Sequence, residues 1–231
     1  MRRPSTKLLI AVPLAAAVLV VGGTWLYIYV VSGDPPARLS FNTVPSGSSS
    51  ASPGTTSGTT ADGTWRLTGD STVGYRVDEV LFGQSATAVG RTNDVTGSLT
   101  VAGSKVTATT FVVQMASVSS DQSRRDGQFR NRIMSVGEFP TATFTLTSPI
   151  ALGSVPADGV TVTAKATGDL TLRGQTKPVT FDVKALRNGA TIQVNGSIPV
   201  VFADWGIPSP SFGPAEVQDH GDLEFLLVFG R

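Results

Sequence analysis

Residues 121–147, DQSRRDGQFRNRIMSVGEFPTATFTLT, hold a helix-like segment within a region that otherwise alternates as β-strands do. Ser119, followed three residues later by Gln122, is typical of a helix N-terminus, and the helix is expected to end near Met134. From residue 141 onward apolar and polar side chains alternate, which is the pattern of a half-buried strand. The stretch therefore predicts one short helix that leads into a strand.

The four arginines of this helix are expected to differ in their surroundings. At about 3.6 residues per turn, Arg125 and Arg132 border an apolar stripe of the helix, whereas Arg124 points to solvent. Arg130 is spaced to pair with Asp126, four residues earlier. Arg125 and Arg132 are therefore the two that could contact whatever the helix covers, although an ion pair with a carboxylate explains Arg125 equally well.

Strand-like alternation continues through most of the sequence from Trp65 to Arg231. Turn residues separate the strands, most clearly at Asn188 and Gly189, a pair typical of a two-residue hairpin. We expect about eight antiparallel strands, which form either a two-sheet sandwich or a closed barrel. The helix favours the barrel, because its apolar face could close one end. The predicted fold class is therefore all-β.

The N-terminal residues contain a predicted membrane anchor. Residues 8–31 carry no charged side chain and, as a helix, are long enough to span roughly 30 Å of hydrocarbon. Because Arg2, Arg3 and Lys7 precede this run, the positive-inside rule predicts a cytoplasmic stub, residues 1–7, and an extracytoplasmic domain in a single-pass protein of the cell membrane. A cleaved signal peptide is the competing interpretation, but its apolar region is typically only about 7 to 15 residues long.

The predicted anchor is followed by a linker and one folded domain. Residues 32–62 are rich in Ser, Thr, Gly and Pro and have few large apolar side chains, so we expect a flexible tether. Residues 63–231 form the expected domain, whose size fits a single hydrophobic core.

Composition argues against several classes of function. The chain has no cysteine, so disulfides and metal-thiolate sites are excluded. Its formal net charge of +1 gives no electrostatic case for nucleic-acid binding. His220 is the only histidine, and no Gly-x-Ser-x-Gly motif accompanies it. We therefore expect no catalytic triad, no metal site, no cofactor and no enzymatic activity.

Three segments of the domain carry recognisable motifs. The first is SRRDGQF, residues 123–129, which leads into FPTATF, residues 139–144. The second is GDLTLRGQTKPV, residues 168–179, and a looser third is DWGI, residues 204–207. Together they resemble the YceI-like polyisoprenoid-binding family, in particular a membrane-anchored, actinobacterial-type member. The chain departs from the family at residues 75–80, which lack a histidine that members often carry on this strand.

The resemblance implies an extended, lipocalin-like antiparallel barrel that holds a long isoprenoid tail in its lumen and has no established catalysis. Strand side chains of one parity would line the lumen, and helix side chains would cover it. A filled core, in a ligand-free module that contacts an envelope protein, needs the same alternation and is the alternative. The predicted lumen residues are Phe111, Val113, Met115, Phe129, Ile133, Met134, Phe144, Leu146, Leu170, Leu172, Phe181 and Val183.

Arg125 and Arg132 are the candidates for contact with a phosphate headgroup at the mouth of the lumen, since a guanidinium can pair bidentately with phosphate. The expected partners are an isoprenoid lipid and, through residues 8–31, the membrane. The expected function is storage, carriage or sensing of that lipid.

Overall fold

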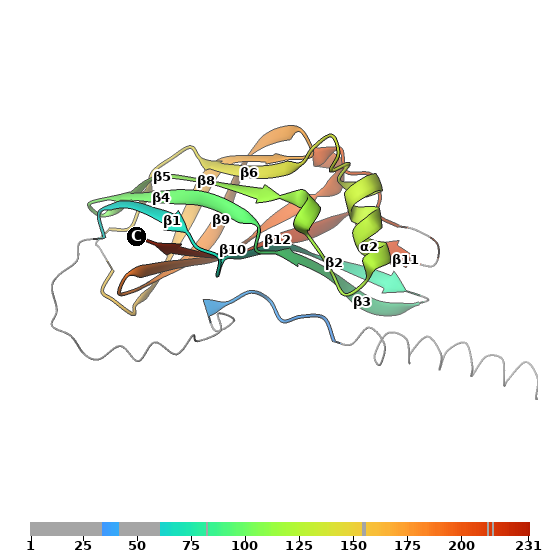
Figure 1. Cartoon of the computed structure of the whole chain (residues 1–231), viewed down its shortest axis with the longest axis horizontal. Helices are drawn as coiled ribbons and strands as arrows, with labels where there is room; N and C mark the ends of the chain where they lie inside the picture. Colours follow the sequence, from blue (N-terminus) through green and yellow to red (C-terminus); the bar gives the residue numbers. More distant parts are fainter. Residues whose placement is uncertain (1–33, 42–60, 82, 154–155, 212, 214) are drawn as a thin grey trace, which may run out of the picture.

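The computed structural model describes most of the chain from residue 34 onward (Figure 1). The predicted anchor, residues 8–31, lies outside the described part and stays a prediction. Among the described residues, no helix has the length and apolar character needed to cross a membrane. The described residues are 34–41, 61–81, 83–153, 156–211, 213 and 215–231.

Twelve strands form one sheet in this part of the chain. Their sequences are rich in valine, threonine and phenylalanine, whose β-branched and aromatic side chains suit a pleated, half-buried surface. The strands are β1 (Gly63–Leu67), β2 (Thr72–Leu81), β3 (Gln84–Thr92), β4 (Val95–Ala102), β5 (Lys105–Gln114), β6 (Thr141–Leu146), β7 (Ile150–Ala151), β8 (Thr161–Leu172), β9 (Gln175–Asn188), β10 (Thr191–Val201), β11 (Ala215–Val217) and β12 (His220–Gly230).

Eight of the described strands close into a barrel, in the order β1, β4, β5, β6, β8, β9, β10, β12 and back to β1. All of these pairings are antiparallel, and the closing one joins Arg66 to Gly230 and Leu67 to Phe229. The β2–β3 hairpin extends the wall at one end, where β2 pairs with β12 and with β11. The prediction of an all-β, eight-stranded antiparallel barrel with a short helix is therefore confirmed.

The helical segment consists of α2 (Ser123–Gln128), which continues directly into a π-helical turn, η4 (Phe129–Ile133). The predicted start at Ser119 was wrong, because the N-cap residue is Gln122. Ser119 instead exchanges two backbone hydrogen bonds with Arg91 in an isolated β-bridge, so the sheet uses its backbone groups. Figure 1 shows α2 at the barrel end that carries the β2–β3 hairpin and β11. The other helical turns described are η3 (Met115–Ser117) and η5 (Phe202–Trp205).

Asp126 of α2 holds the helix against the loop that precedes it. Its Oδ1 accepts hydrogen bonds from the backbone N (2.8 Å) and the Oγ (2.7 Å) of Ser120, and the residue is only 9% exposed. The expected ion pair with Arg130 was therefore wrong, since this carboxylate is used inside the fold.

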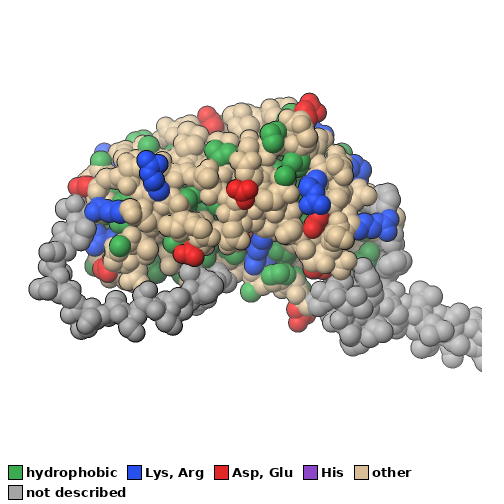
Figure 2. All heavy atoms as spheres, in the orientation of Figure 1, with side chains coloured by type: hydrophobic (Ala, Val, Ile, Leu, Met, Phe, Trp, Pro, Cys, Tyr) green, Lys and Arg blue, Asp and Glu red, His purple; other side chains and the backbone are tan. Residues whose placement is uncertain are grey.

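Inward-facing side chains of the strands form one hydrophobic core. On β12, for example, Phe225, Leu227 and Phe229 alternate toward the core, and none is more than 3% exposed. On the face visible in Figure 2, hydrophobic side chains are scattered among polar ones. The barrel thus keeps most of its large apolar side chains inside.

Residues 34–41, which we call the N-terminal strap, lie across the outer face of the barrel (Figure 1). Its backbone carbonyls accept hydrogen bonds from the guanidiniums of Arg76 and Arg91 and from the Nδ2 of Asn195. Leu39 is buried at 8% exposure. The linker prediction did not anticipate these contacts, which hold eight of its residues on the folded domain.

The two arginines under the strap also pair with a buried carboxylate. Glu224 of β12 is 2% exposed, and its oxygens lie 3.4 Å from the Nε of Arg76 and 2.7 Å from the Nη2 of Arg91. Each guanidinium also donates a hydrogen bond to one strap carbonyl, Arg76 to Pro36 and Arg91 to Ala37. The strap therefore completes a buried polar network of the barrel wall.

Candidate functional site

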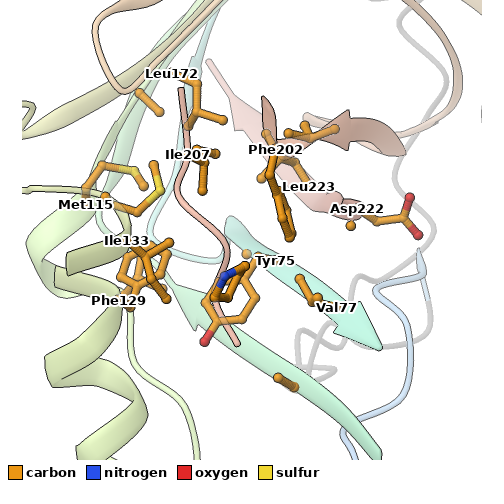
Figure 3. A pocket seen from close by; sticks show the side chains of 18 of the residues that line it. Tyr75, Val77, Met115, Phe129, Ile133, Leu172, Phe202, Ile207, Asp222 and Leu223 are labelled. Carbon is orange, nitrogen blue, oxygen red and sulfur yellow. The ribbon is translucent and has the colours of Figure 1, made fainter. Parts of the chain in front are cut away.

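An apolar cavity of about 330 Å³ lies inside the barrel at the end that carries α2 and η4. Figure 3 shows Phe129 and Ile133 of the helical segment on one side of this space and Val77 of β2 on the other, with the Tyr75 ring next to Phe129. Its size is within the range of roughly 300 to 1,000 Å³ found for small-molecule pockets. The helix thus covers a hollow rather than a filled core.

Eight of the predicted lumen residues line this cavity. They come from strands β5 and β8 and from the helical turns η3 and η4 with the residue that follows η4. For the four residues on β5 and β8, the inward direction follows from the period-two alternation of the strands. The eight are Phe111, Val113, Met115, Phe129, Ile133, Met134, Leu170 and Leu172.

The other predicted lumen residues lie elsewhere. Phe144, Phe181 and Val183 line a second, smaller cavity of about 110 Å³, which Phe111 also borders. Leu146 lines neither of these two cavities and is a half-buried residue packed against the core. The lumen is therefore divided into two spaces.

Sequence reasoning missed most of the cavity wall, including nine large hydrophobic side chains. These nine lie on β2, β10 and β12 and in and after η5. The period-two alternation of the three strands was a usable signal, but the alternation does not say which strands meet at which level of a barrel. The residues are Val73, Tyr75, Val77, Ile198, Val200, Phe202, Ile207, Leu223 and Phe225.

Tyr75 brings a polar group to the cavity wall. Its ring stacks on that of Phe129, with 5.2 Å between the centroids and 16° between the planes. Burial raises the pKa of Tyr75 to about 12; the nearby guanidinium of Arg125 opposes this rise, and three carboxylates add to it. The phenol is therefore a neutral hydrogen-bonding group at physiological pH.

The mouth of the cavity carries paired charges. Arg125 forms an ion pair with Asp121 and lies 3.3 Å, Nη2 to Oε1, from Glu79. Arg124, expected to point away, also lines the cavity although it remains exposed. The charge of Arg125 is thus balanced by carboxylates within the protein.

Arg132 has a different set of partners. Its Nη1 and Nη2 donate to the backbone oxygens of Ser209 and Pro210, at 3.0 and 2.9 Å, and its Nε donates to the Oε1 of Gln128 at 3.1 Å. It therefore joins the helical segment to the loop after η5. Contact of Arg125 or Arg132 with a headgroup stays a prediction.

His220 lies outside this cavity. The residue is exposed, and its Nδ1 is 2.8 Å from a carboxylate oxygen of Asp219, a hydrogen bond that lowers the pKa of Asp219. In the part of the chain that the structure describes, no three His, Asp or Glu side chains are grouped to hold a metal ion.

Comparison with known proteins assigns the domain to a family. The model of the YceI-like domain matches residues 65–229. A UPF0312 protein of Pseudomonas paraeruginosa is 36% identical over 151 residues, which is 60% of this chain and 70% of that protein. A UPF0312 protein of Yersinia enterocolitica is 34% identical over 143 residues, 56% of this chain and 67% of that protein.

Two solved structures share the fold. A polyisoprenoid binding domain from Saccharophagus degradans aligns with a TM-score of 0.59 at 17% identity, covering 72% of this chain and 97% of that one. BcnA of Burkholderia cenocepacia aligns with a TM-score of 0.54 at 21% identity, covering 70% and 98%. At these identities the likeness shows the barrel architecture alone. With the family match over residues 65–229, these findings show that the chain belongs to the YceI-like family.

Proposed function

We propose that the barrel binds the apolar tail of an isoprenoid lipid in its larger cavity. The observation that carries the proposal is the cavity of about 330 Å³, whose wall is built mostly of aliphatic and aromatic side chains. Burial of an unbranched or methyl-branched hydrocarbon in such a space gains about 25 cal/mol for each Å² removed from water. The polyisoprenoid binding domain of Saccharophagus degradans, which shares the fold, supports the choice of ligand.

The polar groups near the mouth suit the end of such a lipid. Tyr75 offers a neutral hydroxyl, and Arg125 offers donors to a phosphate if it exchanges its carboxylate partners. Arg132 holds the adjoining loop, so its contact with a headgroup requires that loop to move. This proposal assigns ligand binding and no catalysis to the domain.

The second part of the proposal is a membrane tether. Residues 8–31 would anchor the chain with its N-terminus in the cytoplasm and the barrel outside. Asp34, at the start of the strap, borders a groove that Glu79 and Arg125 also line. Asp34, the described residue nearest in sequence to the predicted anchor, therefore lies beside the mouth of the cavity, where a membrane lipid could enter.

Uptake of prenols by a blocked variant tests the proposal. Ile133→Arg places a guanidinium at the cavity wall, and an unpaired charge is costly there, so lipid retention should fall at least about tenfold. Asn131→Arg is the matched control, because Asn131 is exposed on the same helical segment and retention should stay unchanged.

The measurement is native mass spectrometry of the chain from residue 34 after incubation with farnesol. One farnesol per barrel is expected for the parent and for Asn131→Arg. A parent barrel that stays empty, or equal binding by both arginine variants, would refute the proposed site.

A further inference from the structure

Four phenylalanine rings form a closed layer across the barrel. Phe111 stacks on Phe144 with 5.3 Å between centroids, and Phe144 meets Phe181 edge-on at 5.3 Å. Phe181 meets Phe225 edge-on at 5.9 Å, and Phe225 returns to Phe111 at 6.2 Å. The rings come from β5, β6, β9 and β12. Each ring therefore contacts two others, and the cycle crosses the lumen from wall to wall.

Glycines in the strands between these phenylalanines give the rings their room. Gly168 of β8 and Gly196 of β10 face inward, and a Cβ at either position would lie 2.5 Å from the ring Cζ of Phe144 or Phe225. Such a distance is far inside van der Waals contact, so a larger residue at either glycine would displace the ring. The layer thus depends on glycines that alternate with phenylalanines on neighbouring strands of the barrel wall.

The layer separates the two cavities of the lumen. Phe111 and Phe225 line both the larger cavity and the smaller one, whereas Phe144 and Phe181 border only the smaller. All four side chains are buried, with exposures of 2 to 7%. A hydrocarbon chain in the larger cavity therefore ends against aromatic rings, and the space beyond is closed to it.

We propose that this four-phenylalanine layer is the floor of the lipid site and sets the length of tail that the barrel accepts. The inference rests on the proposed function, because it assumes an isoprenoid in the larger cavity. Short prenyl tails fit above the layer, and a long tail leaves part of its length in water. Removing one ring joins the two cavities and extends the site toward the far end of the barrel.

Competition between prenols of different length tests the floor. The full chain in detergent is mixed with equal amounts of farnesol, geranylgeraniol and octaprenol and repurified, and the retained prenols are quantified by chromatography. The parent should retain farnesol over octaprenol by at least about tenfold, because each isoprene unit of octaprenol that stays outside the cavity moves from the detergent micelle into water, which costs free energy. Phe181→Ala should lower this ratio at least about fivefold by opening the smaller cavity.

Two further variants keep the test decisive. Phe181→Leu serves if Phe181→Ala fails to fold, because leucine retains most of the apolar volume. It should lower the ratio of farnesol to octaprenol to an intermediate value. Phe139→Ala, at a half-buried phenylalanine that lines neither cavity, should leave the ratio unchanged. Equal retention of farnesol and octaprenol by the parent would contradict the proposed floor while leaving lipid binding intact. A farnesol-to-octaprenol ratio that is the same in the parent and in the Phe181 variants would contradict it too. Retention of no prenol by any chain would instead overturn the proposed function, and the floor with it.

Discussion

At the scale of single residues, the cavity is shaped by aromatic rings that lie over glycines. Tyr75 of β2 is paired across the hairpin with Gly90 of β3, and a Cβ at Gly90 would lie 2.3 Å from a ring carbon of Tyr75. The missing side chain lets the Tyr75 ring reach Phe129 and stack on it. Gly90 therefore positions the polar residue of the cavity wall.

Replacement of Gly90 by alanine should destabilise the domain by about 1 to 3 kcal/mol, because the new methyl group overpacks the site and forces the Tyr75 ring to move. Gly127→Ala is the matched control, since nothing lies within 4 Å of the added Cβ and alanine favours a helix by up to about 1 kcal/mol. Urea unfolding measures both variants. Equal stability of the two would contradict the role given to Gly90.

The phenol of Tyr75 makes a pH-dependent prediction. Burial raises the pKa of Tyr75 to about 12, whereas an unfolded tyrosine titrates near 10. Between these pH values the unfolded chain has lost the proton that the folded chain retains, so the free energy of unfolding should fall as pH rises from 10 to 12.

Spectrophotometric titration checks this prediction directly. Tyr75 is the only tyrosine from residue 34 onward, so a chain that begins there reports on this phenol alone. Phenolate absorbance should appear near pH 12 in the folded protein and near pH 10 in urea. A folded-state midpoint near pH 10 would show that the ring is open to water.

At the scale of elements, the strap and the helical segment are held by contacts that join distant parts of the sequence. The strap carbonyls accept hydrogen bonds from side chains of β2, β3 and β10, and Arg132 of the helical segment donates to the backbone oxygens of Ser209 and Pro210. Leu39 supplies the buried apolar contact of the strap, while Arg38 forms an ion pair with Asp222 at 60% side-chain exposure. The two neighbouring residues thus differ sharply in burial.

Leu39→Ser should destabilise the chain by about 1.5 to 3 kcal/mol, the range for burial of a leucine side chain, and should expose residues 34–41 to proteases. Arg38→Ser should cost no more than about 1 kcal/mol, because its ion pair is largely exposed to solvent. Chemical unfolding combined with limited proteolysis distinguishes the two. If Leu39→Ser behaves like Arg38→Ser, the strap is not anchored as described.

The sequence predicted the elements better than their contacts, for physical reasons. Period-two alternation identified Phe111, Phe144 and Leu170 as inward-facing, because a strand fixes the side of every second residue. The strap escaped prediction, since its composition is that of a linker and its partners lie on strands far along the chain. The misplaced start of the helix has the same origin, because the bridge from Ser119 to Arg91 is a tertiary contact.

At the scale of the whole molecule, the closed sheet leaves a hollow that is apolar inside and covered by a helix at one end. Closure through β1 and β12 pairs the strand edges that an open sheet would expose. The same closure fixes which inward side chains meet at each height along the barrel axis. The four phenylalanine rings fill one height, and the larger cavity lies next to them. Such an arrangement suits retention of a hydrocarbon.

Analysis of the lipid that stays with the protein tests whether the barrel holds an isoprenoid. The full chain, purified in detergent from the cells that express it, would be extracted with organic solvent and the extract examined by mass spectrometry. We expect an isoprenoid lipid in roughly equimolar amount, and its loss in Ile133→Arg but not in Asn131→Arg. An extract without isoprenoid, from a folded chain that also takes up none when farnesol is supplied, would contradict it.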